Sequence, residues 1–567
     1  MRVEFSKYTL TAPKHHAAVG TNLSVVDHWI GRCSRDHRRC GENGEPWYPS
    51  RLLRLSRSRG VKLIISKDSP PKGSYITLSH RWAAQPYTKL KPSTMAQLQH
   101  GIDVASLPQI FQDTITIARH LRIKHLWIDA LCIIQDEDNN ADWEKESQNM
   151  DKIYSCAFLN VSATMSIDGS ESLFKERSWD LLLPSEIELE VNGLNQKYYV
   201  LDGDIWYDDI IDAPLNKRGW VFQERFLARR VLHFGQRQMG WECRELNALE
   251  MFPEGLVPAW AMSSLSKSKF ASMMANLTQR SDETPNMELV SLWQDLVTEY
   301  SKCKLTFSKD KLIAFLGVAK RMMEARTDHY AAGMWEKGMV YDLAWWRLSE
   351  DREAFPISHT SWRAPSWSWA SADGEINFPS IIGGVKQHFI HILESSELIR
   401  NPCSAVSPPA SIRAKGHCLP LSLECSNEEI IGFRVAGSRF AVGRGARCST
   451  IDLELAEEEL LLMVQRGRML FLPLFATSYL LYAIVITKIR GICAHRRLGA
   501  IEIPIMEEVN EEDNQDPRLG KSQAYAWGRQ QSASRLDFTS KFWSMAGIKL
   551  LHYLLNPGRV YRTIDIY

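Results

Sequence analysis

The chain has 567 residues, of which 44% are hydrophobic and 24% charged, and its formal net charge at pH 7 is +1. This length exceeds what one hydrophobic core usually organises, so we expect two or three domains. The composition is that of a globular protein. The near-zero net charge argues against a general binder of nucleic acid or of anionic membranes, which would carry a basic excess.

The 11 cysteines are scattered, and several, among them Cys132, Cys156 and Cys303, lie in apolar runs. The first residues, MRVEFSKYTL, lack the apolar stretch of a secretory signal peptide. Unpaired thiols without such a signal favour a reducing compartment, so we expect a cytoplasmic protein.

One cysteine-rich segment lies near the N-terminus. Residues 25–40 are predicted to be helical, which places Cys33, His37 and Cys40 on one helix face. A structural zinc site usually takes four ligands, and the sequence shows no evident fourth. The sequence therefore favours a half-buried helix face with no metal, and a metal site at these three residues is the alternative.

Residues 73–163 carry alternating strand and helix patterns. The predicted elements are strands over 73–82, 125–134 and 158–163, a helix over 107–121 and a second helix from Asp142. Ser106 is the expected N-cap of the first helix, because Gln109 follows three residues later as in a capping box. This order predicts an α/β fold on a parallel sheet with right-handed crossovers.

The first predicted strand ends in SHRW. Neighbouring strand residues point to opposite faces, so Ser79 and Arg81 share one face and His80 and Trp82 share the other. Ser79 and His80 therefore cannot act as a nucleophile–base pair, which disfavours a serine hydrolase. The sequence also has no Walker loop and no dinucleotide-binding glycine motif, which disfavours phosphoryl transfer and conventional dehydrogenation.

The patterns continue beyond this region. Helices are predicted over 218–228, 289–302, 310–322 and 335–347. A hairpin is expected over 231–234 and 239–243, and PSWSWAS at 365–371 alternates as a strand does.

The last part of the chain is expected to be β-rich. Residues 401–415 are rich in Pro and Ser, as in a linker, and the acidic segment 507–521 is predicted to be a disordered loop. Residues 469–487 carry no charge and are long enough to span a bilayer. Pro473 and the polar 477–479 patch instead favour two buried strands joined by a short turn.

Together these patterns divide the chain into four regions. They are an N-terminal region with the Cys/His helix (1–72), an α/β domain (73–245), a mainly helical region (246–400) and a β-rich C-terminal region (401–567).

Five motifs, in order, resemble the fungal heterokaryon incompatibility (HET) domain family. They are LSHRW, LP-x-I-F-x-D-x-I-x-I-A-R-x-L, LWIDALCIIQD, M-x-x-I-Y-x-x-A, and R-x-W-x-x-Q-E with a trailing W-E-C. Downstream, LTFSKDKLIAFLGVAK, YAAGMW and APSWSWAS look like the segment that follows the domain in that family. The resemblance covers roughly residues 25–375.

This resemblance implies a fold similar to TIR domains, which is a flavodoxin-like parallel sheet with flanking helices. It implies an intracellular effector or signalling protein of fungal allorecognition that promotes programmed cell death. The expected partners are proteins of the incompatibility system, or a second copy of the chain, with no nucleic acid and no membrane span. Some TIR domains hydrolyse NAD, so the alternative is a TIR-like NAD hydrolase, with NAD as substrate and no cofactor.

Three residues are candidates for chemistry. Glu224 is the first, because a carboxylate stabilises the oxocarbenium-like state formed when a nicotinamide–ribose bond breaks. Asp129 lies near the carboxyl end of its predicted strand, where open α/β sheets bind ligands, and Ser79 ends the first strand. Asp129 has a structural alternative, which is to cap a helix or to pair with Arg81 or Arg218 inside the domain.

Five further residues are candidates for ligand binding: Arg81, Trp82, Arg218, Trp220 and Gln223. The tryptophan rings are suited to stacking on a base and the guanidinium groups to pairing with a pyrophosphate. The alternative is that Trp220, Gln223 and Glu224 fix their helix to the sheet through packing and ion pairs.

Overall fold

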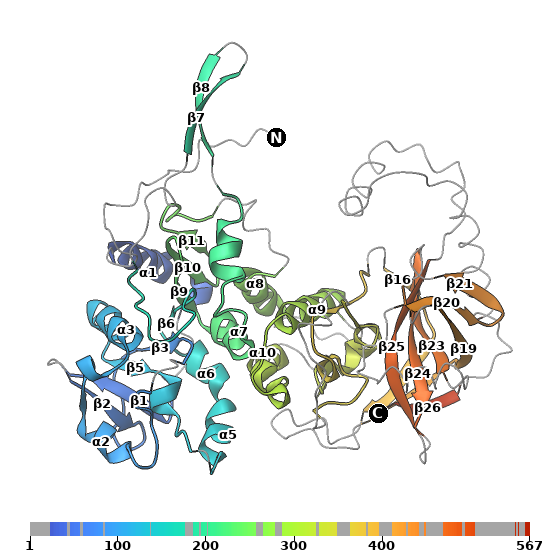
Figure 1. Ribbon diagram of the computed structural model, residues 1–567, viewed down its shortest axis with the longest axis horizontal. Coiled ribbons are helices and arrows are strands. Elements are labelled where there is room, and N and C mark those ends of the chain that lie inside the picture. Colours follow the sequence, from blue (N-terminus) through green and yellow to red (C-terminus); the bar gives the residue numbers. More distant parts are fainter. Residues whose placement is uncertain are drawn as a thin grey trace. The chain divides into compact units, whose positions relative to one another are not determined.

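The computed structural model divides into two compact units, Met1–Ser281 with Lys302–Thr327 and Asp282–Ser301 with Asp328–Tyr567. Figure 1 colours both along the chain. The structure describes residues 23–41, 46–56, 60–82, 86–136, 138–175, 185–191, 194–200, 202–256, 265–277, 286–324, 328–348, 363–381, 384–395, 411–426, 429–441, 447–448, 469–489, 494–504, 550, 554 and 562–566.

The first unit is built on a nine-stranded sheet in the order β11-β10-β9-β6-β3-β5-β1-β2-β4. Its strands are β1 Arg51–Leu55, β2 Gly60–Ile65, β3 Tyr75–Ser79, β4 Ile102–Asp103, β5 His125–Trp127, β6 Leu159–Ser162, β9 Arg230–Phe234, β10 Met239–Cys243 and β11 Asn247–Leu249. The neighbours β5, β3, β6 and β9 are parallel, and antiparallel strands extend the sheet at both edges. Counted along the chain, the parallel strands lie in the order 2-1-3-4, so the winding reverses between β3 and β6.

Helices cover both faces of this sheet. They are α1 Ser24–Asp36, α2 Met95–His100, α3 Gln109–His120, α4 Asp129–Cys132, α5 Ala141–Ser147, α6 Met150–Ser155, α7 Gly219–Leu227, α8 Lys267–Leu277 and α10 Ile313–Met323, and a separate hairpin joins β7 Ser185–Val191 to β8 Leu194–Val200. α6, α7 and α10 pack together on one face, and α1 and α3 lie on the other (Figure 1). The side chains of α7 therefore meet one face of β3 and β6.

The predicted α/β class is confirmed, and so are the helix at 218–228 and the hairpin that follows it. Two local predictions are wrong. The strand predicted over 125–134 ends at Trp127, because the Asp129 carboxylate accepts a hydrogen bond from the Ala130 amide at 2.7 Å and starts the short helix α4. Ser106 is not the N-cap of α3, which has Pro108 at that position.

Asp113 of α3, the acidic residue of the second motif, is an internal anchor. Its buried carboxylate accepts hydrogen bonds from Ser172 Oγ at 2.7 Å and from the Leu173 amide at 2.8 Å. We expect Asp113→Ala to lower the free energy of unfolding by about 1–3 kcal/mol, because the Leu173 amide would stay buried without an acceptor. Urea denaturation measures this, with Thr116→Ala on the exposed face of the helix as control; equal losses in both variants would contradict it.

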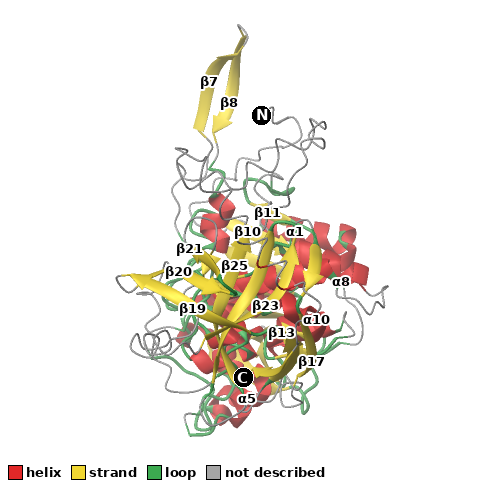
Figure 2. Ribbon diagram, turned by 90° about the vertical axis from the view of Figure 1, so that its right-hand side faces the viewer, coloured by secondary structure: helices red, strands yellow, loops and turns green. Residues whose placement is uncertain are grey.

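The second unit contains α9 Met287–Ser301, α11 Met339–Asp342 and an eleven-stranded antiparallel-rich sheet whose main path is β17-β18-β26-β25-β24-β23-β19-β20-β21. The strands, yellow in Figure 2, are β16 Val385–His388, β17 Ile390–Ser395, β18 Ile412–Gly416, β19 Leu419–Ser426, β20 Glu429–Val435, β21 Ser438–Ala441, β22 Arg447–Cys448, β23 Met469–Thr477, β24 Leu480–Lys488, β25 His495–Pro504 and β26 Arg562–Ile566. Two short pairs, β12 Tyr330–Ala331 with β13 Met334–Trp335 and β14 Trp346–Arg347 with β15 Ile376–Asn377, complete the unit. The predicted β-rich region is thus confirmed.

The uncharged segment 469–487 forms two strands, as predicted. β23 and β24 pair antiparallel from Met469 opposite Thr487, and most of their residues are buried. Within the described ranges no helix is long and apolar enough to cross a membrane. The predicted acidic loop at 507–521 and residues 401–410 of the predicted linker lie outside the described residues.

Two predictions for this unit are wrong. Residues 335–347 do not form one helix, because the Arg497 guanidinium donates to the carbonyl oxygens of Leu343 and Trp345, which a continuing helix would use itself. PSWSWAS is not a strand, since Ser368 caps the 3₁₀ turn Trp369–Ser371 by accepting from the Ala370 amide at 3.1 Å.

Candidate functional site

A buried hydrogen bond joins β3 to α7. Ser79, the last residue of β3, donates from Oγ to Glu224 Oε2 at 2.5 Å, and both residues are buried. Alternation along β3 turns Thr77 and Ser79 toward α7. It turns His80 to the other face, where its ring packs edge-on against Phe111 of α3 with centroids 5.0 Å apart. Ser79 is therefore coupled to a carboxylate and not to the neighbouring histidine.

Two residues that the sequence analysis did not propose for the site complete this cluster. Asn160 of β6 accepts at Oδ1 from Thr77 Oγ1 at 3.0 Å and donates from Nδ2 to Ser79 Oγ at 3.0 Å. Tyr154 of α6 lies close enough to the Glu224 carboxyl to affect its ionisation. The sequence signal for Asn160 was its position in the middle of the apolar strand FLNVSA, because a buried amide side chain needs a polar partner.

The environment makes Glu224 hard to ionise. The pKa of its carboxyl is raised from 4.5 to about 7, mainly by burial and also by the charge of Asp129, while the Ser79 hydrogen bond and the Arg218 charge oppose the rise. The pKa of the Tyr154 hydroxyl is also well above its ordinary value, through burial and the same two carboxylates. Glu224 is thus a carboxyl that both holds and releases a proton near neutral pH.

The cluster lies where the winding of the sheet reverses. Ser79 ends β3 and Asn160 lies in β6, and the chain winds in opposite directions on either side of this strand pair. In open α/β sheets the crevice outside the carboxyl ends of two such strands is the usual ligand site. The position of the cluster and its polar side chains are therefore both those expected of a ligand site.

A more exposed rim lies beside it. Trp82, 38% exposed, donates from Nε1 to Asp129 Oδ2 at 2.8 Å, and Lys89 Nζ stands 4.3 Å from the centroid of the Trp82 ring. Asp129 is one-third exposed and close enough to Glu224 for its charge to affect that carboxyl. The rim thus presents an aromatic face, a cation and a carboxylate.

His80 and Arg218 join the rim to the cluster. Arg218, the N-cap of α7, donates from Nη1 to the His80 carbonyl at 2.9 Å. His80 Nδ1 is 3.8 Å from Asp129 Oδ1, too far for a hydrogen bond, and both ring nitrogens are buried without a hydrogen-bond partner in the described structure. Burial lowers the pKa of His80, so its ring is neutral at pH 7.

Three of the predicted ligand-binding residues form their hydrogen bonds outside the Glu224 cluster. Gln223 accepts at Oε1 from the Gly317 amide of α10 at 3.2 Å, and Trp220 donates to Asp310 Oδ2 at 3.3 Å. Arg81 donates to the Ile167 carbonyl at 3.3 Å. Trp220 and Gln223 therefore connect α7 with the segment around α10, whereas the structural alternative expected them to fix α7 to the sheet. Of the three residues in that alternative, Glu224 forms a hydrogen bond with the sheet.

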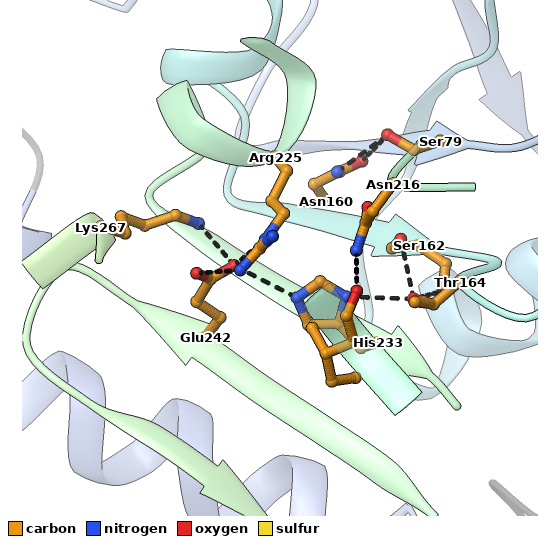
Figure 3. Close-up of polar contacts among 10 residues, drawn as sticks. Ser79, Asn160, Ser162, Thr164, Asn216, Arg225, His233, Glu242 and Lys267 are labelled. Atoms are coloured by element: carbon orange, nitrogen blue, oxygen red, sulfur yellow. Dashed lines mark hydrogen bonds and ion pairs between the residues drawn. The ribbon is translucent and has the colours of Figure 1, made fainter. Parts of the chain in front are cut away.

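A second buried network adjoins α7 (Figure 3). Glu242 of β10 accepts from Arg225 at 2.8 and 3.0 Å, lies 3.2 Å from His233 Nε2 and 3.7 Å from Lys267 Nζ. On the far side of the ring, His233 Nδ1 is 3.0 Å from Thr164 Oγ1. Burial would raise the pKa of Glu242, but the Arg225 and Lys267 charges hold it well below its ordinary value. The carboxylate is thus a fixed anion that joins α7 and α8 to the sheet.

A surface cavity lies at the amino ends of the parallel strands. Its volume is about 880 Å³, and its lining includes Ser74, Lys124 and Phe158, which immediately precede β3, β5 and β6. The Glu224 cluster contributes no residue to it. The cavity and the cluster are therefore separate features.

Comparisons with known proteins identify the region that holds the cluster. The family model described as Heterokaryon incompatibility protein (HET) matches residues 75–224, from the first residue of β3 to Glu224, which is about a quarter of the chain. No curated protein and no solved structure matched the chain. The matched segment contains Ser79, Asp129 and Glu224, so the cluster and its rim, built on the motifs described above, lie in the part of the chain that is similar to heterokaryon incompatibility (HET) domains, residues 75–224.

Proposed function

We propose that this chain is a cytoplasmic effector of heterokaryon incompatibility whose HET domain promotes programmed cell death after recognition of non-self. The family match supports a role in incompatibility. Protein partners of the incompatibility system, or a second copy of the chain, would engage the domain. The Glu224 cluster with its rim is the part of the domain that we propose to be functional.

One observation carries this proposal. Glu224 is buried beside Ser79 with a pKa of about 7, at the strand pair where open α/β sheets bind ligands. A carboxyl in such a place reduces stability at neutral pH, because its charge is desolvated. Perturbed carboxyls of this kind concentrate at functional sites.

A second candidate function is a TIR-like NAD hydrolase. The parallel-strand order 2-1-3-4 matches the first four strands of a flavodoxin-like sheet, which favours this candidate. In the reaction the bond between nicotinamide and ribose C1′ breaks, water oxygen bonds to C1′, and a proton is released. Ionised Glu224 would stabilise the positive charge on the ribose or orient its hydroxyls, and the exposed Trp82 face would stack on a base.

Replacing Glu224 with glutamine tests both functions. We expect Glu224→Gln to abolish the growth arrest caused by overexpression of the full chain in a fungal host, because the amide keeps the shape but cannot ionise. The matched control is Glu254→Gln, which removes a carboxylate whose side chain is 62% exposed. Both variants must accumulate to the wild-type level and keep a cooperative melting transition.

The outcomes separate the two functions. Lost growth arrest together with lost NAD consumption by the purified protein supports the hydrolase. Lost growth arrest with no NAD consumption by the wild type supports a binding effector. Full growth arrest in Glu224→Gln would show that neither proposed function depends on Glu224.

A further inference from the structure

Four potential metal ligands from distant parts of the chain meet in the first unit. One ligand atom from each of Cys33, His37, Cys40 and Cys243 lies within 4.8 Å of all the others. Cys243 ends β10, and the other three belong to the N-terminal segment. The fourth ligand that the sequence did not reveal is therefore the cysteine of the trailing W-E-C motif.

A break in the N-terminal helix makes this meeting geometrically feasible. In one continuous helix Cys33 and Cys40 would be about 10 Å apart along the axis. Instead α1 ends at Asp36, His37 has extended backbone angles (φ −96°, ψ 106°), and a 3₁₀ turn over Arg38–Cys40 follows. The prediction of one helix over 25–40 is thus wrong, and the break directs all three side chains toward one point.

We propose that these four residues bind a structural zinc ion. Three thiolates and one imidazole are a common tetrahedral zinc set, in which neighbouring ligand atoms are about 3.8 Å apart at Zn–S distances near 2.3 Å. The observed spread of up to 4.8 Å needs only small side-chain movements to reach that geometry. Cys33, Cys40 and Cys243 are buried and His37 is half-buried, so the set is closed to substrate, as in structural sites.

The charge of Arg230 supports this assignment independently. Arg230 is buried, and it donates from Nε to Cys33 Sγ at 3.2 Å and from Nη2 to the Cys40 carbonyl at 3.2 Å. In the described part of the chain no carboxylate pairs with it. A buried guanidinium needs an anion, and Zn²⁺ with three thiolates and a neutral imidazole carries a net charge of −1. Arg230 and the zinc centre therefore neutralise each other.

The zinc ion would fasten an N-terminal segment to the sheet. Cys40 and Cys243 lie on either side of the matched region 75–224, so the site joins two parts of the chain that the family model does not include. The contact beside it is also tight, since the buried rings of Trp29 in α1 and Trp241 in β10 stack with centroids 6.0 Å apart. The folded HET unit would thus extend from α1 to β11, and the zinc ion would link its N-terminal segment to β10.

The test is the metal content of the full-length protein, purified under reducing conditions without chelator. We expect one zinc per chain in the wild type and in Cys156→Ser, which removes a half-buried thiol of the same unit. Cys243→Ser should lose most of the zinc. Protein produced with Co²⁺ in place of zinc should show the visible absorption bands of a tetrahedral thiolate site. This measurement uses only the wild-type protein, so it tests the proposal even if Cys243→Ser does not fold.

Several results would overturn the proposal. Wild-type protein with far less than one zinc per chain that also fails to take up Co²⁺ in a tetrahedral site is one. A disulfide between any two of the three cysteines in freshly isolated protein is another. Unchanged zinc content in folded Cys243→Ser would place the metal elsewhere.

Discussion

Replacing Glu242 with glutamine is expected to lower the free energy of unfolding by about 3–5 kcal/mol, which is the usual cost of removing one partner from a buried ion pair. Glu242 is 1% exposed and is the anion that faces both Arg225 and Lys267. Burial lowers the pKa of the Lys267 amine to about 8 even with Glu242 present. Without the carboxylate, two cations would lie close together in a site with no counter-charge.

Chemical denaturation at pH 7 measures this loss. Glu254→Gln is the matched control, because its carboxylate pairs with Arg32 and His28 at the surface, where such pairs contribute less than about 1 kcal/mol. Equal losses in the two variants would show that the Glu242 network is solvated and contributes no more than surface charges do. A smaller loss in Glu242→Gln at pH 9 than at pH 7 is also expected, since Lys267 would then be neutral.

The stability of the wild type relative to Glu224→Gln is expected to fall as the pH rises from 5 to 8. Burial raises the pKa of Glu224 from 4.5 in the unfolded chain to about 7 in the folded chain. Between these values the folded chain holds a proton that the unfolded chain has released, so raising the pH favours unfolding. The shift corresponds to about 2–3 kcal/mol of relative destabilisation between pH 5 and pH 8.

The measurement is the free energy of unfolding of both proteins at pH 5 and pH 8, at one salt concentration. Glutamine does not titrate, so the difference between variant and wild type isolates this carboxyl. A difference for Glu224→Gln that does not vary with pH would mean that Glu224 ionises like a surface glutamate.

The local elements followed largely from sequence periodicity. The helix at 218–228 and the hairpin after it have strong apolar spacing, and the structure contains them as α7, β9 and β10. Three of the failures, over 125–134, 335–347 and 365–371, have a common cause, which is a side chain or a distant group that takes backbone hydrogen bonds away from the expected element. Asp129 starts α4 in this way, and Arg497 ends the helix expected over 335–347.

The sequence by itself determined the α/β class, the burial of residues 469–487 in strands and the resemblance to the HET family, because apolar spacing and motif order are local properties of the chain. Only the tertiary structure decided that Ser79 bonds to Glu224, that Gln223 turns to α10, and that Cys243 joins the N-terminal cysteines. These contacts join residues far apart in sequence. Their distances depend on strand order and on the break at His37, which periodicity does not encode.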